Sequence, residues 1–144
     1  DLINDWFKYG KYESCQLFNA YGPTEGVITS TLRKVNAKDK QCVRIGRVIG
    51  NRVLYVLDRN LELVPAGMIG ELFIGGQDLA RGYLNEPKLT NQRFIKSPFS
   101  ERAEDRLYRT GDLVRYLSDG NLHFVGRIDV CYDGHHARAV AYCR

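Results

Sequence analysis

From Arg44 onward, short apolar runs alternate with turn residues, and this spacing restricts the fold more than any other feature of the sequence. Glycine, proline, aspartate and asparagine interrupt each run before it reaches the length of a typical helix. Short strands at such even spacing predict an antiparallel sheet or a distorted barrel over residues 44–129, interrupted by a short helix from Pro87 that carries Arg93 and Phe94. The runs expected to form strands are 52–57, 70–74, 106–110, 113–116 and 122–126.

The first part of the chain has a different pattern. Apolar residues at helical spacing predict a helix over residues 2–9, and a strand over 16–19 leads into a Gly22-Pro23 turn. The β-branched residues of 27–32 predict an extended segment. We therefore expect an α+β, strand-rich fold with the end of an α/β layer, a barrel-like unit and a divergent tail, at residues 1–43, 44–129 and 130–144.

Charge and composition narrow the function classes. The net charge of +4 comes from 21 basic and 17 acidic residues spread along the chain, which argues against a nucleic-acid partner. No apolar run is long enough for a bilayer, so no membrane partner is expected. Because the chain begins with Asp1 and not Met, we expect a fragment. A cytoplasmic location, without a zinc site or disulfide scaffold, is predicted from four cysteines that form no C-x-x-C pair: Cys15, Cys42, Cys131 and Cys143.

The first segment that carries chemistry is the turn after the strand at 16–19. It presents the ring of Tyr21, the hydroxyl of Thr24 and the carboxylate of Glu25 close together in sequence. An aromatic face can stack on a purine, a hydroxyl can donate to a phosphate oxygen, and a carboxylate suits the hard cation Mg²⁺. The same residues also fit a purely structural Gly-Pro turn with a half-buried tyrosine.

Two later residues have similar potential. Asp112 follows Gly111 at the end of a predicted strand, where its two oxygens could accept hydrogen bonds from both hydroxyls of a ribose. Arg127 could form charge-assisted bonds to a phosphate or ribose oxygen. The structural alternatives are an aspartate that closes a hairpin and a surface ion pair between Arg127 and Asp129.

In their order and spacing, these segments resemble the adenylation domains of nonribosomal peptide synthetases, within the acyl- and aryl-adenylating enzyme superfamily. The resemblance implies the C-terminal part of the large adenylation subdomain, an enzyme that uses ATP and Mg²⁺ to activate an amino acid, and a partner carrier domain whose phosphopantetheine thiol receives it. It spans about residues 15–129 and is carried by Asn19-Ala-Tyr-Gly-Pro-Thr-Glu25, Gly70-Glu-Leu-Phe-Ile-Gly-Gly76, Ala80-Arg-Gly-Tyr-Leu-Asn85, Arg93-Phe94, Tyr108-Arg-Thr-Gly-Asp-Leu113 and Gly126-Arg-Ile-Asp129.

The resemblance also implies roles for individual residues. The implied nucleotide contacts are Tyr21 on adenine, Asn19 at the adenine edge, Thr24 on phosphate, Asp112 on the ribose hydroxyls and Arg127 on ribose or phosphate. The other implied sites are Glu25 for Mg²⁺, Ala20 and Ile28 for the amino-acid pocket, and Asp129 for the hinge between the large and small subdomains.

The sequence departs from the family pattern in three ways. Phe124 stands where many members have a tyrosine whose hydroxyl reaches the ribose. After Asp129 the expected Gln-Val-Lys-Ile-Arg-Gly-like run gives way to an unrelated tail, for which we hypothesise a frameshift, an altered splice or a gene fragment. The His135-His136 pair in this tail lacks the spacing of metal ligands. The phosphate loop and the catalytic lysine of the family are absent, so we expect no complete catalytic set.

Two other functions stay open. The chain could come from an acyl- or aryl-acid-CoA ligase-type adenylating enzyme, or it could be an inactive truncated remnant that binds nucleotide weakly. An acidic residue that pairs with the substrate ammonium group would favour an amino acid over the first alternative. For the second, ATP binding that is weakened by Asp112→Ala would support a residual nucleotide site, and no binding at all would favour a folding remnant.

Overall fold

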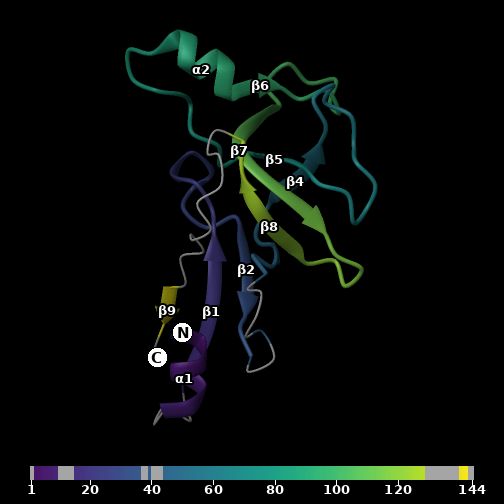
Figure 1. Cartoon of the computed structure of the whole chain (residues 1–144). Coiled ribbons are helices and arrows are strands. Elements are labelled where there is room, and N and C mark those ends of the chain that lie inside the picture. The colour runs from purple at the N-terminus through teal and green to yellow at the C-terminus, as the bar shows by residue number, and fades with distance from the viewer. Residues whose placement is uncertain (1, 10–14, 37–38, 40–43, 129–139, 143–144) are drawn as a thin grey trace.

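The computed structural model describes residues 2–9, 15–36, 39, 44–128 and 140–142. Two antiparallel sheets make up most of this part of the chain (Figure 1). The first sheet has the strand order β3-β2-β1-β9, and helix α1 (Leu2–Tyr9) lies beside it. Its strands are β1 (Gln16–Tyr21), β2 (Thr31–Lys34), β3 (Arg47–Val48) and β9 (Val140–Tyr142).

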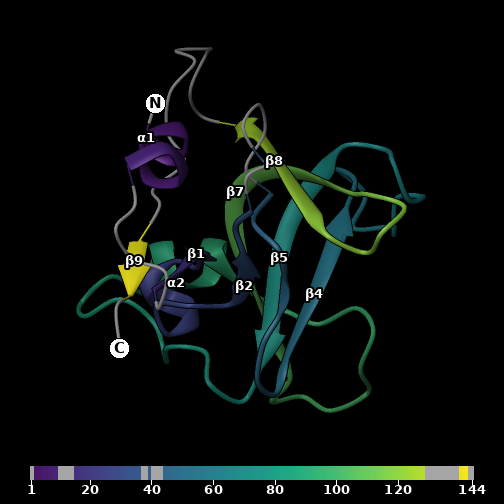
Figure 2. The same ribbon diagram turned by 90° about the horizontal axis from the view of Figure 1, so that it is seen from below.

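The second sheet has the order β4-β5-β7-β6, and β8 also pairs with β7 (Figure 2). The long strand β7 pairs with β5 along one edge, while β6 and β8 pair with its first and last residues respectively. Helix α2 (Pro87–Arg93) leads directly into β6. The strands of this sheet are β4 (Arg52–Leu57), β5 (Gly70–Gly76), β6 (Phe94–Lys96), β7 (Arg106–Tyr116) and β8 (Leu122–Arg127).

Alternating side chains on β5 divide the core of the second sheet into two faces, because successive residues of a strand point to opposite sides. Leu72 belongs to the cluster on one face, and Tyr21 of the first sheet packs against this cluster. Phe73 belongs to the cluster on the other face, with Leu57 and Leu107. A third cluster places α1 against the first sheet through Ile3, Leu17 and Val35. Tyr21 therefore stands where the two sheets meet.

The regular elements follow the sequence pattern closely. The predicted helix at 2–9 and the strand at 52–57 have the expected bounds, and the strands that begin at residues 16, 70 and 122 extend one or two residues further than expected. The helix at Pro87 is present, but Phe94 begins β6 instead of continuing the helix. The short strand β3 lies after residue 44 and pairs with β2, so strand pairing crosses the predicted boundary between residues 43 and 44.

The prediction that residues 27–32 are extended is wrong at its start. Val27 and Ile28 adopt left-handed backbone angles, with φ of 58° and 63°, and β2 begins only at Thr31. These angles fold the chain back after the 3-10 turn Thr24–Gly26, so that the Ser30 amide donates to the carbonyl of Tyr21 at 2.8 Å. Closure of the turn on itself outweighs the preference of β-branched residues for strands.

The prediction of two strands on either side of a Gly111-Asp112 turn is also wrong. A single strand, β7, runs through both residues, and its register against β5 shifts there. One residue lies between Glu71 and Phe73 on β5, while three lie between their respective partners Leu113 and Arg109 on β7. Gly111, at φ +77°, supplies the left-handed angle that this bulge requires. A glycine that permits a turn permits a bulge equally well.

None of the described helices is long and apolar enough to cross a membrane. The predicted hinge residue Asp129 and the His135-His136 pair lie outside the described residues, as do Cys42, Cys131 and Cys143. Cys15 is a free thiol.

Gly22→Ala should destabilise the chain by about 1–3 kcal/mol, because a Cβ atom there would lie 2.6 Å from both the Ile28 carbonyl oxygen and the Ser30 amide nitrogen. Urea denaturation followed by tryptophan fluorescence measures the change. Gly126→Ala is the matched control, since no atom lies within 4 Å of a Cβ at that position. Equal free energies of unfolding for the two variants would contradict the proposed role of the close approach at Gly22.

Candidate functional site

Three residues singled out in the sequence meet at the junction of the two sheets. Tyr21 ends β1, while Asp112 and Arg127 face one another as a cross-strand pair on β7 and β8. The Tyr21 hydroxyl donates a hydrogen bond to Oδ2 of Asp112, and Nη1 of Arg127 donates to Oδ1 at 2.8 Å. The carboxylate is thus held at both oxygens by groups that arrive from different strands.

Burial and charge set the electrostatics of this group. Asp112 is only 7% exposed, whereas the Arg127 side chain is 40% exposed and carries the positive charge to the surface. The pKa of the Tyr21 hydroxyl is raised, first by burial and then by the Asp112 charge and the hydrogen bond to it. A neutral, hydrogen-bonded Tyr21 leaves the negative charge of the group on Asp112.

Glu25 lies in a second group, made with residues of the loop and strand that follow β5. The Tyr83 hydroxyl donates to Oε1 of Glu25 at 2.5 Å, and the Ala80 amide donates to the Glu25 carbonyl at 2.9 Å. Burial alone would raise the pKa of Glu25, but hydrogen bonds from the tyrosine hydroxyls of Tyr83 and Tyr108 and the Arg93 charge leave it lowered. Glu25 is therefore an ionised, oriented carboxylate.

Gly111 lies between the two groups. A Cβ atom at this position would lie 3.2 Å from Nη2 of Arg127 and 3.3 Å from Nη1 of Arg93. Two guanidinium groups therefore converge over a residue without a side chain, between the carboxylates of Glu25 and Asp112. An arrangement of this kind can hold a polyanion whose hydroxyl-bearing part reaches Asp112.

The remaining predicted residues are placed less directly. Asn19 is 2% exposed, and its amide Nδ2 donates to the Arg44 carbonyl at 2.8 Å, so it braces the strand. Thr24 is exposed at the start of the 3-10 turn, Ala20 is half-buried and Ile28 is 73% exposed. Phe124 packs against the cluster of Leu72 and Val114 and offers no hydroxyl at this place.

Sequence reasoning missed four residues around these groups, although each lies within or beside a quoted motif. Three of them, Tyr83, Arg93 and Tyr108, surround Glu25. The fourth, Glu71, is a buried carboxylate whose Oε1 accepts the Gly111 amide at 3.0 Å. The signal for Glu71 was an acidic residue inside an otherwise apolar strand, since a buried carboxylate requires a partner.

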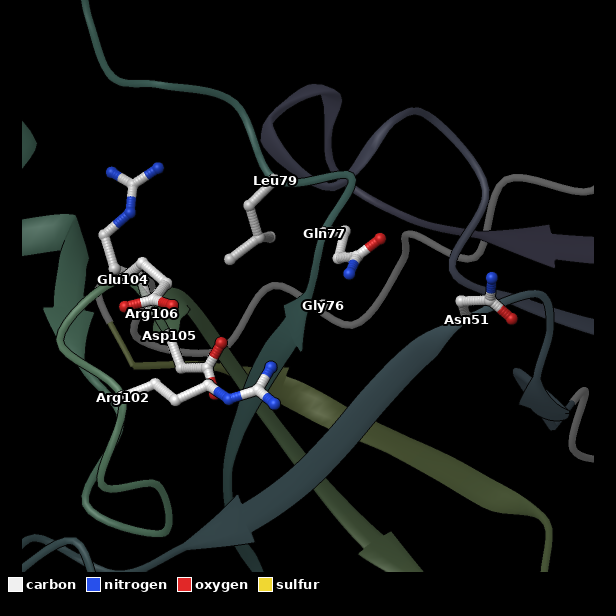
Figure 3. Close-up of a pocket in the computed structure, with 8 residues that line it drawn as sticks. All are labelled: Asn51, Gly76, Gln77, Leu79, Arg102, Glu104, Asp105 and Arg106. Atoms are coloured by element: carbon white, nitrogen blue, oxygen red, sulfur yellow. The ribbon is translucent and has the colours of Figure 1, made fainter.

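A separate hollow of about 490 Å³ opens at the other end of β7, between the start of β4 and the loop before β7 (Figure 3). Asn51 and Gln77 line one side, and Arg102 and Asp105 line the other. None of the predicted site residues lines it. Among the described residues, no group of three or more histidine, cysteine, aspartate or glutamate side chains could hold a metal ion by itself.

The sequence matches the family described as AMP-binding enzyme over residues 3–84, more than half of the chain. It is 60% identical to a linear gramicidin synthase of Brevibacillus parabrevis over 79% of the chain, and 46% identical to bacitracin synthase 3 of Bacillus licheniformis over 89% of the chain. These matches span only 1% and 2% of the two relatives.

The fold matches solved structures of the same kind of protein. One is a four-domain nonribosomal peptide synthetase bound to AMP and glycine, with a TM-score of 0.71 and 43% identity over 79% of this chain and 8% of that one. Another is a synthetase protein that contains adenylation and PCP domains, with a TM-score of 0.71 and 34% identity over 78% of this chain and 20% of that one.

The stability of the chain should fall above pH 10, and Tyr21 should contribute to the fall. Its folded-state pKa is raised above the usual 10.0, so its contribution is fully present below pH 10 and is lost as the unfolded state ionises at higher pH. Each such tyrosine adds up to about 1.4 kcal/mol per pH unit to the slope. Urea unfolding between pH 8 and 11 should give a shallower slope for Tyr21→Phe. Parallel curves for the two proteins would show that the hydroxyl is not held as described.

Proposed function

Because the chain belongs to the family of AMP-binding enzymes, we propose that it forms the adenine, ribose and magnesium side of the ATP site in an amino-acid-adenylating enzyme of nonribosomal peptide synthesis. The observation that supports this most strongly is the contact of Tyr21, Asp112 and Arg127 at the junction of the two sheets. Three residues from separate motifs meet there, as a nucleotide site requires.

The proposed reaction begins with attack of the amino-acid carboxylate on the α-phosphorus of ATP. A bond to the carboxylate oxygen forms, the bond to the leaving oxygen breaks, and pyrophosphate departs. The phosphopantetheine thiol of a carrier domain then displaces AMP from the aminoacyl-adenylate. Chemistry of this kind depends on positioning and charge neutralisation more than on covalent participation of the protein.

The chain's residues divide this positioning among themselves. The ring of Tyr21 receives the adenine, and Asp112 accepts hydrogen bonds from the ribose hydroxyls, for which a carboxylate has sufficient capacity even with Tyr21 and Arg127 bound to it. Arg127 holds a ribose or phosphate oxygen, and Thr24 donates to a phosphate oxygen. Asn19 fixes the strand at the adenine edge through the carbonyl of Arg44.

Glu25 suits the role of the magnesium ligand. Its carboxylate is ionised, half-buried and oriented by the Tyr83 hydroxyl, and a single carboxylate together with phosphate oxygens and water is the usual ligand set for this cation. When bound, Mg²⁺ neutralises charge on the phosphates. The Tyr83 hydroxyl orients the Glu25 carboxylate, and the Ala80 amide holds the backbone carbonyl of the same residue. The positive charge of Arg93 favours the ionised carboxylate.

The wider context of the site belongs to the proposal as well. Ala20 and Ile28 line the amino-acid pocket, and Asp129 acts as the hinge that allows the large and small subdomains to reorient. The first sheet and α1 form the end of an α/β layer, and the second sheet belongs to a distorted β-barrel. The carrier partner is supported by a structural relative that contains adenylation and PCP domains.

Pyrophosphate exchange into ATP, assayed with the protein at its full natural length, distinguishes the alternatives. Exchange that depends on an amino acid supports this proposal. Exchange that depends instead on an aryl or fatty acid would assign the chain to a CoA ligase-type enzyme. The absence of exchange together with only weak ATP binding would identify an inactive remnant.

Glu25→Gln should weaken ATP binding in excess Mg²⁺ about tenfold, because the amide keeps the hydrogen bond to Tyr83 but loses the charge that attracts the cation. In EDTA the variant and the parent should bind ATP equally. Calorimetry with and without Mg²⁺ measures both values. Glu86→Gln is the control. Glu86 is the N-cap residue of α2, and its side chain makes no capping hydrogen bond to the helix. An unchanged magnesium dependence in Glu25→Gln would remove Glu25 from the metal site.

A further inference from the structure

Behind the site, a buried carboxylate holds the β7 bulge that carries Asp112. Glu71 is 6% exposed and stands on β5 on the same face as Phe73, two residues away. Asp112 projects from the bulge to the Tyr21 side of the sheet. Glu71 thus contacts the bulge from one face while Asp112 is presented on the other.

The contacts of Glu71 are specific. Its Oε1 accepts the Gly111 amide at 3.0 Å, and the Arg109 guanidinium binds both oxygens, with Nε at 3.1 and 2.9 Å and Nη2 at 2.9 Å from Oε2. Hydrogen bonding to Glu71 raises the pKa of Arg109. Arg109 also lies over the Phe73 ring, with Cζ 5.9 Å from its centroid. The guanidinium therefore fixes the direction in which the carboxylate points.

The bulge needs such support because it interrupts the ladder between β5 and β7. Inside it, Thr110 Oγ1 donates to the Leu72 carbonyl at 2.7 Å and accepts the Asp112 amide at 3.0 Å, while the Gly111 carbonyl accepts the Ile128 amide at 2.9 Å. The Gly111 amide is a further buried donor of the bulge, and Glu71 is its acceptor. A buried amide without an acceptor is costly, so its loss would let the bulge shift.

We propose that the Glu71–Arg109 ion pair is a positioning device for nucleotide binding, which sets the Asp112 carboxylate for the ribose hydroxyls. Glu71 contacts no nucleotide and acts through Gly111. Loss of the ion pair should therefore affect ribose recognition selectively. A misplaced Asp112 weakens the contacts to the ribose hydroxyls and leaves those to the base and the phosphates in place. This inference rests on the proposed role of Asp112 as the ribose ligand.

The test compares ATP with 2′,3′-dideoxy-ATP, which lacks both hydroxyls that Asp112 would bind. Calorimetry on the protein at its full natural length gives the ratio of the dissociation constant for 2′,3′-dideoxy-ATP to that for ATP. The parent should prefer ATP about tenfold or more, as expected for charge-assisted hydrogen bonds, and Asp112→Ala should lower the ratio to about one. Each variant serves as its own control, because partial unfolding weakens binding of both nucleotides equally.

Two near-isosteric variants of Glu71 separate the acceptor from the charge. Glu71→Met removes the acceptor and should lower the ratio at least about threefold, mainly through weaker ATP binding. Glu71→Gln keeps an oxygen for the Gly111 amide and should retain most of the preference. If Glu71→Met does not fold, Arg109→Met provides the same test, since this side chain is 46% exposed and its loss leaves Glu71 without the group that orients it.

Asp39→Ala is the matched control. Asp39 is likewise a buried carboxylate that accepts a backbone amide, that of Asn36 at 2.9 Å, and an arginine, Arg33 at 2.9 Å, and neither partner belongs to the site. It should lower stability without changing the ratio. If Glu71→Met and Arg109→Met keep the ratio of the parent while Asp112→Ala lowers it to about one, the positioning role of the ion pair is wrong and the ribose role of Asp112 stands. A ratio unchanged by Asp112→Ala would overturn the proposed ribose role itself.

Discussion

The hydrogen bonds to the Asp112 carboxylate connect the two sheets, and the candidate site depends on them. Tyr21 belongs to the first sheet, whereas Asp112 and Arg127 belong to the second. A carboxylate that is 7% exposed would be costly without compensation, so Arg127 stabilises its charge and Tyr21 fills the second oxygen. The same contacts place an aromatic ring beside an acidic group, the combination that a nucleoside requires.

The strand that carries Asp112 is irregular where the site needs it to be. A regular β7 would continue the ladder with β5 and direct successive side chains to fixed faces. The two additional residues at Thr110–Asp112 turn the carboxylate toward Tyr21 and bring Gly111 under the guanidinium groups of Arg93 and Arg127. Bulges of this kind commonly redirect functional side chains. Glu71 holds this bulge from the opposite face of the sheet through the Gly111 amide, and Arg109 orients the Glu71 carboxylate.

The sequence was sufficient where local patterns decide the structure. The strand at Arg52–Leu57 follows from its apolar residues and flanking turn residues, and the helix at Pro87 follows from its first-turn proline. Local patterns failed at Val27, where the turn closed by the Ser30 amide on the Tyr21 carbonyl outweighs the strand preference of a β-branched residue. They failed at Gly111 because a left-handed angle can serve a turn or a bulge, and the contact with Glu71 is distant in sequence. The proposed nucleotide residues were identified through family motifs. The contact between Tyr21 and Asp112, 91 residues apart, could not be read from spacing.

We propose that the junction of the two sheets, and not the hollow at the far end of β7, receives the nucleotide. A crystal structure of the full-length protein with AMP would locate the nucleotide. We expect the adenine on the Tyr21 ring, the ribose hydroxyls within hydrogen-bond distance of Asp112, and the phosphate toward Arg127 and Glu25. AMP bound between Asn51 and Arg102, with no ribose hydroxyl within hydrogen-bond distance of Asp112, would overturn this placement.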